Sequence, residues 1–193
     1  MYKEKKRGWF GSLPTWLLVG GGVVAGILFV AGFNTALSYT NTTEFCTSCH
    51  SMQTNEREWK ESMHYKNAAG VRAECADCHV PKEFVPKMIA KVMAAKDVYH
   101  EIMGTIDTPE KYEAYRWHMA SQVWKKMKAN DSRECRTCHD WDQMDLSEQG
   151  RSARKRHPRA IDKGQTCIDC HKGVAHEEPD EPEEEEAENE AAG

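Results

Sequence analysis

The stretch "EFCTSCHSM", residues 44–52, decides the fold, because Cys46 and Cys49 are followed directly by His50. In a C-x-x-C-H sequence the two thiols form thioether bonds to a haem, and the adjacent imidazole is placed to reach its iron. The pattern occurs four times and uses all eight cysteines; the other copies are Cys75, Cys78 and His79; Cys135, Cys138 and His139; and Cys167, Cys170 and His171. The sequence therefore predicts four covalently attached haems c.

Two other uses of paired cysteines fit this pattern less well. A zinc site needs no histidine directly after its second cysteine, and neither does a disulfide framework. Of the 193 residues, 39% are hydrophobic and only five are Phe, so a conventional core would be thin. Four haems would supply the missing apolar area, and we expect the chain to wrap around them.

Residues 15–33, "TWLLVGGGVVAGILFVAGF", form a run of 19 residues without a charge, which is about the length of a membrane-spanning helix. Four of the first seven residues are basic and one is acidic. The positive-inside rule therefore places residues 1–14 in the cytoplasm and everything after residue 33 outside. We predict a single-pass protein of the bacterial inner (cytoplasmic) membrane, with its haem domain, residues 34–176, in the periplasm.

A cleaved signal peptide is the alternative for this segment. Signal peptides have a shorter apolar region and end in a small-residue cleavage site, whereas "NTALSYT" offers a poor one. An uncleaved anchor in the lipid bilayer is therefore favoured, and both alternatives export the haem domain. Gly22 and Gly26 form a G-x-x-x-G pattern, which is compatible with a homodimer through the anchor helix.

The rest of the chain divides into two halves and a tail. Cys46 and Cys75 are 29 residues apart, Cys135 and Cys167 are 32 apart, and a long cysteine-free stretch separates the pairs. The fold class we predict is mainly α: one transmembrane helix plus a small multihaem cytochrome c domain built from two dihaem halves. Residues 177–193 carry ten acidic side chains and no aromatic one, so this tail is expected to be disordered. No nucleic-acid partner is expected.

Two helices are predicted in the stretch between the halves. One covers about 85–103. The other begins with Thr108 as its N-cap and Pro109 as its first residue, and its apolar residues then recur at spacings of three and four. No segment alternates polar and apolar residues for long enough to predict a strand.

Low-spin electron-transfer haems need a second axial ligand besides the motif histidine. Five further histidines are available for four irons, so spacing alone leaves the choice open; they are His64, His100, His118, His157 and His176.

The residues from the anchor to His176 resemble the NapC/NirT family of membrane-anchored tetrahaem quinol dehydrogenases. The resemblance rests on long adjacent runs, which include "TTEFCTSCHSM", "SMHYKN", "GVRAECADCHVPKEFVPKMIAK" and "DKGQTCIDCHKGVAH". The resemblance is greatest for the NapC branch. It implies that the protein oxidises membrane quinol (menaquinol or ubiquinol) and passes the electrons to a periplasmic reductase, for which periplasmic nitrate reductase is the first candidate. The alternatives are an NrfH-like or NirT-like donor to a nitrite reductase, or a passive relay that does not oxidise quinol.

The resemblance also implies a ligand for three of the irons. His64 would serve the third haem, His176 the second and His157 the fourth, which leaves His100 and His118 without a role in ligation.

The first haem has two candidates for its motif-side ligand. In the related NrfH branch a methionine two residues after the motif histidine coordinates this haem, and Met52 matches that position. A thioether favours ferrous iron and raises the potential, which suits a haem that accepts electrons. The alternative is that His50 binds the iron and Met52 packs on the porphyrin edge.

The resemblance places the quinol pocket beside the first haem. There Lys91 would hydrogen-bond a quinol oxygen, and Asp97 would take a proton or approach the open side of the iron. Six residues separate the two on one helix, so their directions differ by about 120° and they meet only if they flank the haem edge. The basic run "RSARKRHPR", residues 151–159, would bind the reductase or, alternatively, anionic lipid headgroups.

Overall fold

The computed structural model describes residues 14–182, and within this range the chain is helical with no strand. The predicted mainly α fold class with one N-terminal apolar helix is therefore confirmed. The α-helices are α1 (Thr15–Tyr39), α2 (Thr43–Cys46), α3 (Gln53–Glu61), α4 (Cys75–His79), α5 (Phe84–Ile102), α6 (Pro109–Ala129), α7 (Arg133–Arg136) and α8 (Arg151–Asp162). Three short 3-10 turns accompany them: η2 (His50–Met52), η3 (Trp141–Gln143) and η4 (Cys167–Asp169).

Helix α1 is the one helix in the described residues that is long and apolar enough to cross a membrane. It continues six residues beyond Phe33, the last residue of the predicted span. Polar side chains in this extension bond back to the helix: Asn34 Nδ2 donates to the Val30 carbonyl at 2.8 Å, and Thr35 Oγ1 donates to the Ala31 carbonyl at 2.9 Å. The contacts of the chain divide it into two units, and the boundary along the chain falls between Asn41 and Thr42.

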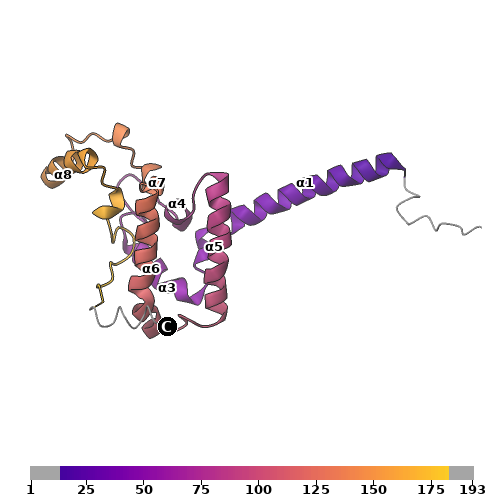
Figure 1. Ribbon diagram of the computed structural model, residues 1–193, viewed down its shortest axis with the longest axis horizontal. Coiled ribbons are helices and arrows are strands. Elements are labelled where there is room, and N and C mark those ends of the chain that lie inside the picture. The colour runs from indigo at the N-terminus through magenta and orange to yellow at the C-terminus, as the bar shows by residue number, and fades with distance from the viewer. Residues whose placement is uncertain (1–13, 183–193) are drawn as a thin grey trace, which may run out of the picture. The chain divides into compact units, whose positions relative to one another are not determined.

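The second unit is organised by α5 and α6, its two longest helices (Figure 1). Both helices confirm the sequence prediction closely. Thr108 caps α6 by accepting a hydrogen bond from the Lys111 backbone N–H at 3.3 Å. The turn between the helices uses Gly104 at φ +66°, and Lys111 Nζ bonds its carbonyl at 3.1 Å.

Helix α3 lies between these two long helices and is tied to both. Tyr112 of α6 bonds Asn55 of α3 at 2.8 Å, and Glu101 of α5 accepts the His50 backbone N–H, just before α3, at 3.1 Å. The same carboxylate accepts a hydrogen bond from the Ser51 hydroxyl.

The polypeptide buries few apolar side chains of its own. Among the described residues only Trp59, Tyr112 and Ile168 are buried hydrophobic side chains. This agrees with a chain whose core is supplied largely by haem.

Contacts connect the four C-x-x-C-H loops in sequence order. Thr43 Oγ1 donates to Glu74 at 2.5 Å, which joins the first loop to the second. Helices α4 and α7 contact each other, which joins the second to the third. Ser132, fully buried before the third loop, accepts the Ile168 N–H of the fourth at 3.1 Å.

Candidate haem and electron-transfer site

Three pairs of histidine rings face each other across the second unit. The ring centres of His79 and His176 are 6.2 Å apart, those of His64 and His139 are 6.2 Å apart, and those of His157 and His171 are 6.0 Å apart. Each pair combines one C-x-x-C-H histidine with one histidine from outside the motifs.

This spacing suits two imidazoles on opposite sides of one iron. A metal–imidazole bond is about 2 Å long, so two such bonds and the two ring radii place the ring centres roughly 6 Å apart. The residues therefore fit three bis-histidine haems, paired as the family resemblance implies. The axial roles themselves stay predictions, which the spacing supports.

Hydrogen bonds at the second ring nitrogen agree with the same roles. His64 Nδ1 lies 3.1 Å from the Val174 carbonyl, and His157 Nδ1 lies 2.6 Å from Gln149 Oε1. A carbonyl acceptor fixes the proton on Nδ1 and leaves Nε2 free to bind a metal. In both cases the residue that orients the ring is distant in sequence or lies on a neighbouring loop.

The first motif has a different environment. None of the three ring pairs includes His50, whose backbone N–H is held by Glu101. The Met52 sulfur accepts a hydrogen bond from Asn55 Nδ2 at 3.8 Å. The choice between His50 and Met52 as ligand of the first haem stays open on this geometry.

The remaining two histidines have local partners. His100 Nδ1 lies 3.1 Å from Thr105 Oγ1, and the His118 ring packs edge-on against Tyr115 at 5.5 Å. Neither ring faces a motif histidine, which agrees with their having no role in ligation.

Of the two predicted quinol residues, the structure brings Lys91 to the first motif. Its ammonium is close enough to Cys46 to lower the pKa of a free thiol there, and burial lowers the pKa of the lysine, with Lys87 acting in the same direction. Asp97 is exposed on the same helix. The two side chains thus occupy different positions around α5, as their six-residue separation predicts.

Helix α8 places positive charge beside the fourth motif. It carries His157, which faces His171, and five basic residues exposed to solvent: Arg151, Arg154, Lys155, Arg156 and Arg159.

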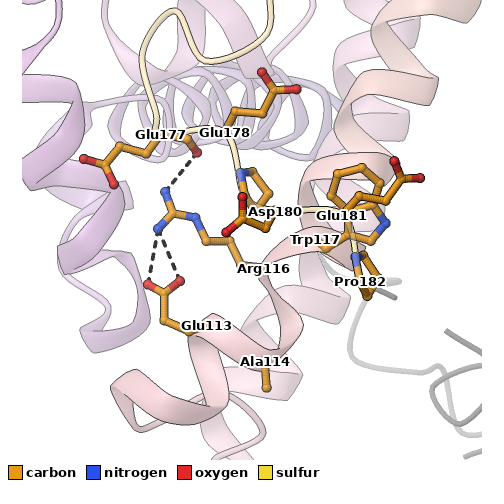
Figure 2. A pocket seen from close by; sticks show the side chains of 10 residues that line it. Glu113, Ala114, Arg116, Trp117, Glu177, Glu178, Asp180, Glu181 and Pro182 are labelled. Atoms are coloured by element: carbon orange, nitrogen blue, oxygen red, sulfur yellow. Dashed lines mark hydrogen bonds and ion pairs between the residues drawn. The ribbon is translucent and has the colours of Figure 1, made fainter. Parts of the chain in front are cut away.

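A buried ion pair near His176 was not predicted from the sequence. Arg116 Nη2 lies 2.6 Å from Glu58 Oε1, and the two side chains are only 11% and 6% exposed. Figure 2 shows Arg116 reaching the backbone carbonyl of Glu177, at 2.9 Å, and the carboxylate of Glu113. The pair joins residues 58 positions apart, and no local pattern announces such a contact.

The hollow drawn in Figure 2 lies between α6 and residues 177–182. These six residues belong to the predicted tail, and they line the hollow together with residues of α6 that include Arg116 and Trp117. Half of the ten lining residues are acidic and none comes from a C-x-x-C-H motif, so we assign the hollow no ligand. The rest of the tail, 183–193, lies outside the described residues, as do residues 1–13.

Four C-x-x-C-H loops and three suitably spaced histidine pairs define a multihaem c-type cytochrome. The family model for the NapC/NirT cytochrome c family, N-terminal region, matches residues 11–181, so the chain belongs to that family. Its members are membrane-anchored tetrahaem cytochromes that transfer electrons, and the predicted family is therefore confirmed. Covalently bound haem c and an electron-transfer role follow from this membership.

Three relatives illustrate the range of the family. A putative tetrahaem cytochrome c of Allochromatium vinosum is 68% identical over 82% of this chain and 86% of its own length. The cytochrome c-type protein NapC of Escherichia coli is 54% identical over 88% and 84%. The denitrification system component NirT of Stutzerimonas stutzeri is 52% identical over 82% and 80%. No solved structure matched the chain.

Proposed function

We propose that this protein oxidises membrane quinol at its first haem and delivers the electrons to a periplasmic reductase, with periplasmic nitrate reductase as the first candidate. The observation that carries the proposal is the position of Lys91, half-buried beside the first C-x-x-C-H loop on a helix rich in exposed apolar side chains.

The haem-binding residues in this proposal are those predicted from the sequence. The attaching cysteines are Cys46, Cys49, Cys75, Cys78, Cys135, Cys138, Cys167 and Cys170. The axial ligands are Met52 or His50, and then His79 with His176, His139 with His64, and His171 with His157. When bound, the haems supply one-electron redox chemistry at each site.

Helix α5 suits a lipid-soluble substrate. Nine large hydrophobic side chains between residues 84 and 103 are exposed, among them Val92 at 73% and Ile102 at 78%. An isoprenoid quinol is largely apolar and carries two polar oxygens at its head. Apolar surface around a half-buried cation such as Lys91 can bind such a molecule and orient its head.

Lys91 and Asp97 would divide the proton chemistry between them. The lysine ammonium donates a hydrogen bond to a quinol oxygen and stabilises the negative charge that develops as the proton leaves. Oxidation of one quinol releases two protons and two electrons, and the electrons would pass singly to the haems. Asp97 is exposed, so its carboxylate can accept the protons one at a time and release each to water on the periplasmic side.

The order of the loops suggests the path of the electrons. Contacts run from the first loop to the second through Thr43 and Glu74, to the third through α4 and α7, and to the fourth through Ser132 and Ile168. Electrons would therefore leave from the fourth haem, beside the basic helix α8, where an acidic reductase surface could dock.

A donor to a nitrite reductase is the second candidate function, and the NirT relative at 52% identity favours keeping it. The test is steady-state turnover in proteoliposomes that contain quinol and the full-length protein, with either periplasmic nitrate reductase or nitrite reductase added. Faster turnover with nitrate reductase supports the proposal, and faster turnover with nitrite reductase favours the second candidate.

A homodimer through α1 is a further part of the proposal. Outside the backbone of α1 itself, no atom of the described residues 14–182 lies within 4 Å of a β-carbon position at Gly22 or Gly26, so a second helix could approach their backbone closely. Crosslinking of native membranes would detect the dimer, and Gly22→Leu together with Gly26→Leu should abolish it.

A further inference from the structure

Polar residues on α3 and α6 meet in two neighbouring contacts that the function described so far does not use. Asn55 and Glu58 are three residues apart on α3, and Tyr112 and Arg116 are four apart on α6, so each pair lies on one helix face. We propose that this set, the α3–α6 ladder, is a positioning device that holds an axial ligand of the first haem and an axial ligand of the second haem.

The first contact of the ladder reaches Met52. Tyr112 Oη donates to Asn55 Oδ1 at 2.8 Å, and this bond orients the amide so that its Nδ2 donates to the Met52 sulfur at 3.8 Å. Tyr112 is buried, with 6% exposure. The tyrosine therefore fixes the amide, and the amide fixes the thioether.

The second contact reaches His176. Glu58 accepts the Glu177 backbone N–H at 3.0 Å, while Arg116 donates to the Glu177 carbonyl at 2.9 Å. The Glu58–Arg116 ion pair thus holds both backbone polar groups of Glu177, the residue that follows His176. The Glu58 carboxylate also lies 3.9 Å from His176 Nδ1.

His176 Nδ1 is a buried atom without a hydrogen-bond partner in the described part of the chain. The two acceptors beside it are the Glu58 carboxylate and the backbone carbonyl of Asn55. Both belong to α3. A histidine that binds iron through Nε2 donates its Nδ1 proton to such an acceptor, so either group completes the geometry of an axial ligand.

Stability alone gives a weak reason for this arrangement. A buried ion pair costs about as much in desolvation as it gains from attraction, so apolar residues of similar size would serve the fold equally well. The pair instead fixes geometry, because Arg116 distributes its donors among Glu58, Glu113 and the Glu177 carbonyl.

The two contacts should shift the reduction potentials of their haems in opposite directions. An anionic carboxylate near Nδ1–H makes an imidazole a stronger donor and favours ferric iron. An N–H donor to a thioether sulfur makes it a weaker donor and favours ferrous iron. The ladder therefore raises the potential of the first haem and lowers that of the second. This inference rests on the proposed ligand roles of Met52 and His176.

Redox potentiometry of the purified full-length protein, resolved into four midpoints by optical and EPR spectra, tests the proposal. We expect Glu58→Gln to raise one midpoint potential by ~59 mV, which corresponds to about a tenfold change in the ferric-to-ferrous ratio for one electron. Glu58→Asp keeps the charge, so its midpoint should stay close to that of the native protein. Asn55→Leu should lower a different midpoint by a similar factor and shift the thioether–iron charge-transfer absorption. Tyr112→Phe should give a smaller shift of the same sign.

Glu113→Gln is the matched control, because it removes an exposed carboxylate from the same arginine. The proposal is overturned if Glu58→Gln moves no midpoint more than this control does, if both contacts act on the same haem, or if the unaltered protein has no thioether–iron absorption. Should Glu58→Gln lower the haem content, Asn55→Leu and Tyr112→Phe still decide the first contact. Because no quinol is present, failure of quinol oxidation would leave these results unaffected.

Discussion

His64 and His139 face each other with their ring centres 6.2 Å apart, although 75 residues separate them in the chain. His64 lies between the first two C-x-x-C-H motifs, whereas His139 belongs to the third. The pair therefore links the two stretches of sequence that cysteine spacing assigns to separate halves.

This pairing predicts the effect of replacing His64. His64→Met should convert one bis-histidine haem into a histidine–methionine haem, and its midpoint should rise because a thioether favours ferrous iron. EPR-monitored potentiometry would show a single haem changing class. His118→Met, at a ring that packs on Tyr115, should leave all four haems unchanged. Equal effects of the two variants would contradict the assignment.

The ion pair between Lys128 of α6 and Asp169 of the fourth loop predicts a dependence on pH. Lys128 Nζ lies 2.6 Å from Asp169 Oδ1. The lysine together with the Thr166 backbone N–H lowers the pKa of Asp169 from 3.8 to about 2. A carboxyl with a depressed pKa stabilises the fold above its unfolded pKa, and this contribution is lost as the pH falls through the folded value.

The test compares thermal unfolding of the native protein with that of Asp169→Asn, which keeps an acceptor for Thr166 and removes the charge. The melting temperature of the variant should be lower at neutral pH. The difference should shrink between pH 3.8 and about 2 and then disappear. A difference that persists below pH 2 would show that the charge is not its cause.

The turn between α5 and α6 predicts a stability cost at Gly104. At φ +66°, a β-carbon there would lie 2.9 Å from Asp107 Oδ2. Gly104→Ala should therefore destabilise the protein by more than the roughly 1–2 kcal/mol of a left-handed backbone alone, because the Asp107 carboxylate must turn away and give up its ion pair with Lys111. Gly164→Ala is the control, because Gly164 has a similar φ of +62° and open space around it. Chemical denaturation of both variants measures the difference, and equal losses would exclude the steric contribution.

The basic helix α8 predicts how the reductase is recognised. Lys155→Glu together with Arg159→Glu should lower the second-order rate of electron transfer to the reductase by roughly tenfold at low salt and flatten its dependence on ionic strength. Lys125→Glu, an exposed charge reversal on α6, is the control. If it slows the transfer equally, the site of docking is not α8.

Local sequence signals were sufficient for much of this fold. The anchor, the two long helices and the cap at Thr108 each depend on a short run of residues, which determines its own conformation through apolar periodicity or capping. The haem-attachment motifs are equally local, because a C-x-x-C-H sequence carries its chemistry within five residues.

Long-range contacts could not be derived in the same way. The Glu58–Arg116 pair needs α3 and α6 to be placed side by side, which depends on the packing of the whole unit. The continuation of α1 beyond the predicted span could not be derived either, because Asn34 and Thr35 look like residues that leave a membrane helix. Their side chains instead bond carbonyls of the preceding turn and prolong it.

The most direct test of the central proposal is anaerobic stopped-flow reduction of the oxidised full-length protein by menaquinol and ubiquinol analogues, followed at the haem α-band. Lys91→Gln is measured in parallel, and Lys96→Gln on the same helix is its control. We predict rapid reduction of the native protein and the control, and a loss of at least tenfold in Lys91→Gln. Equal rates in all three proteins, or no reduction by quinol of a sample that dithionite reduces fully, would contradict quinol oxidation beside the first haem.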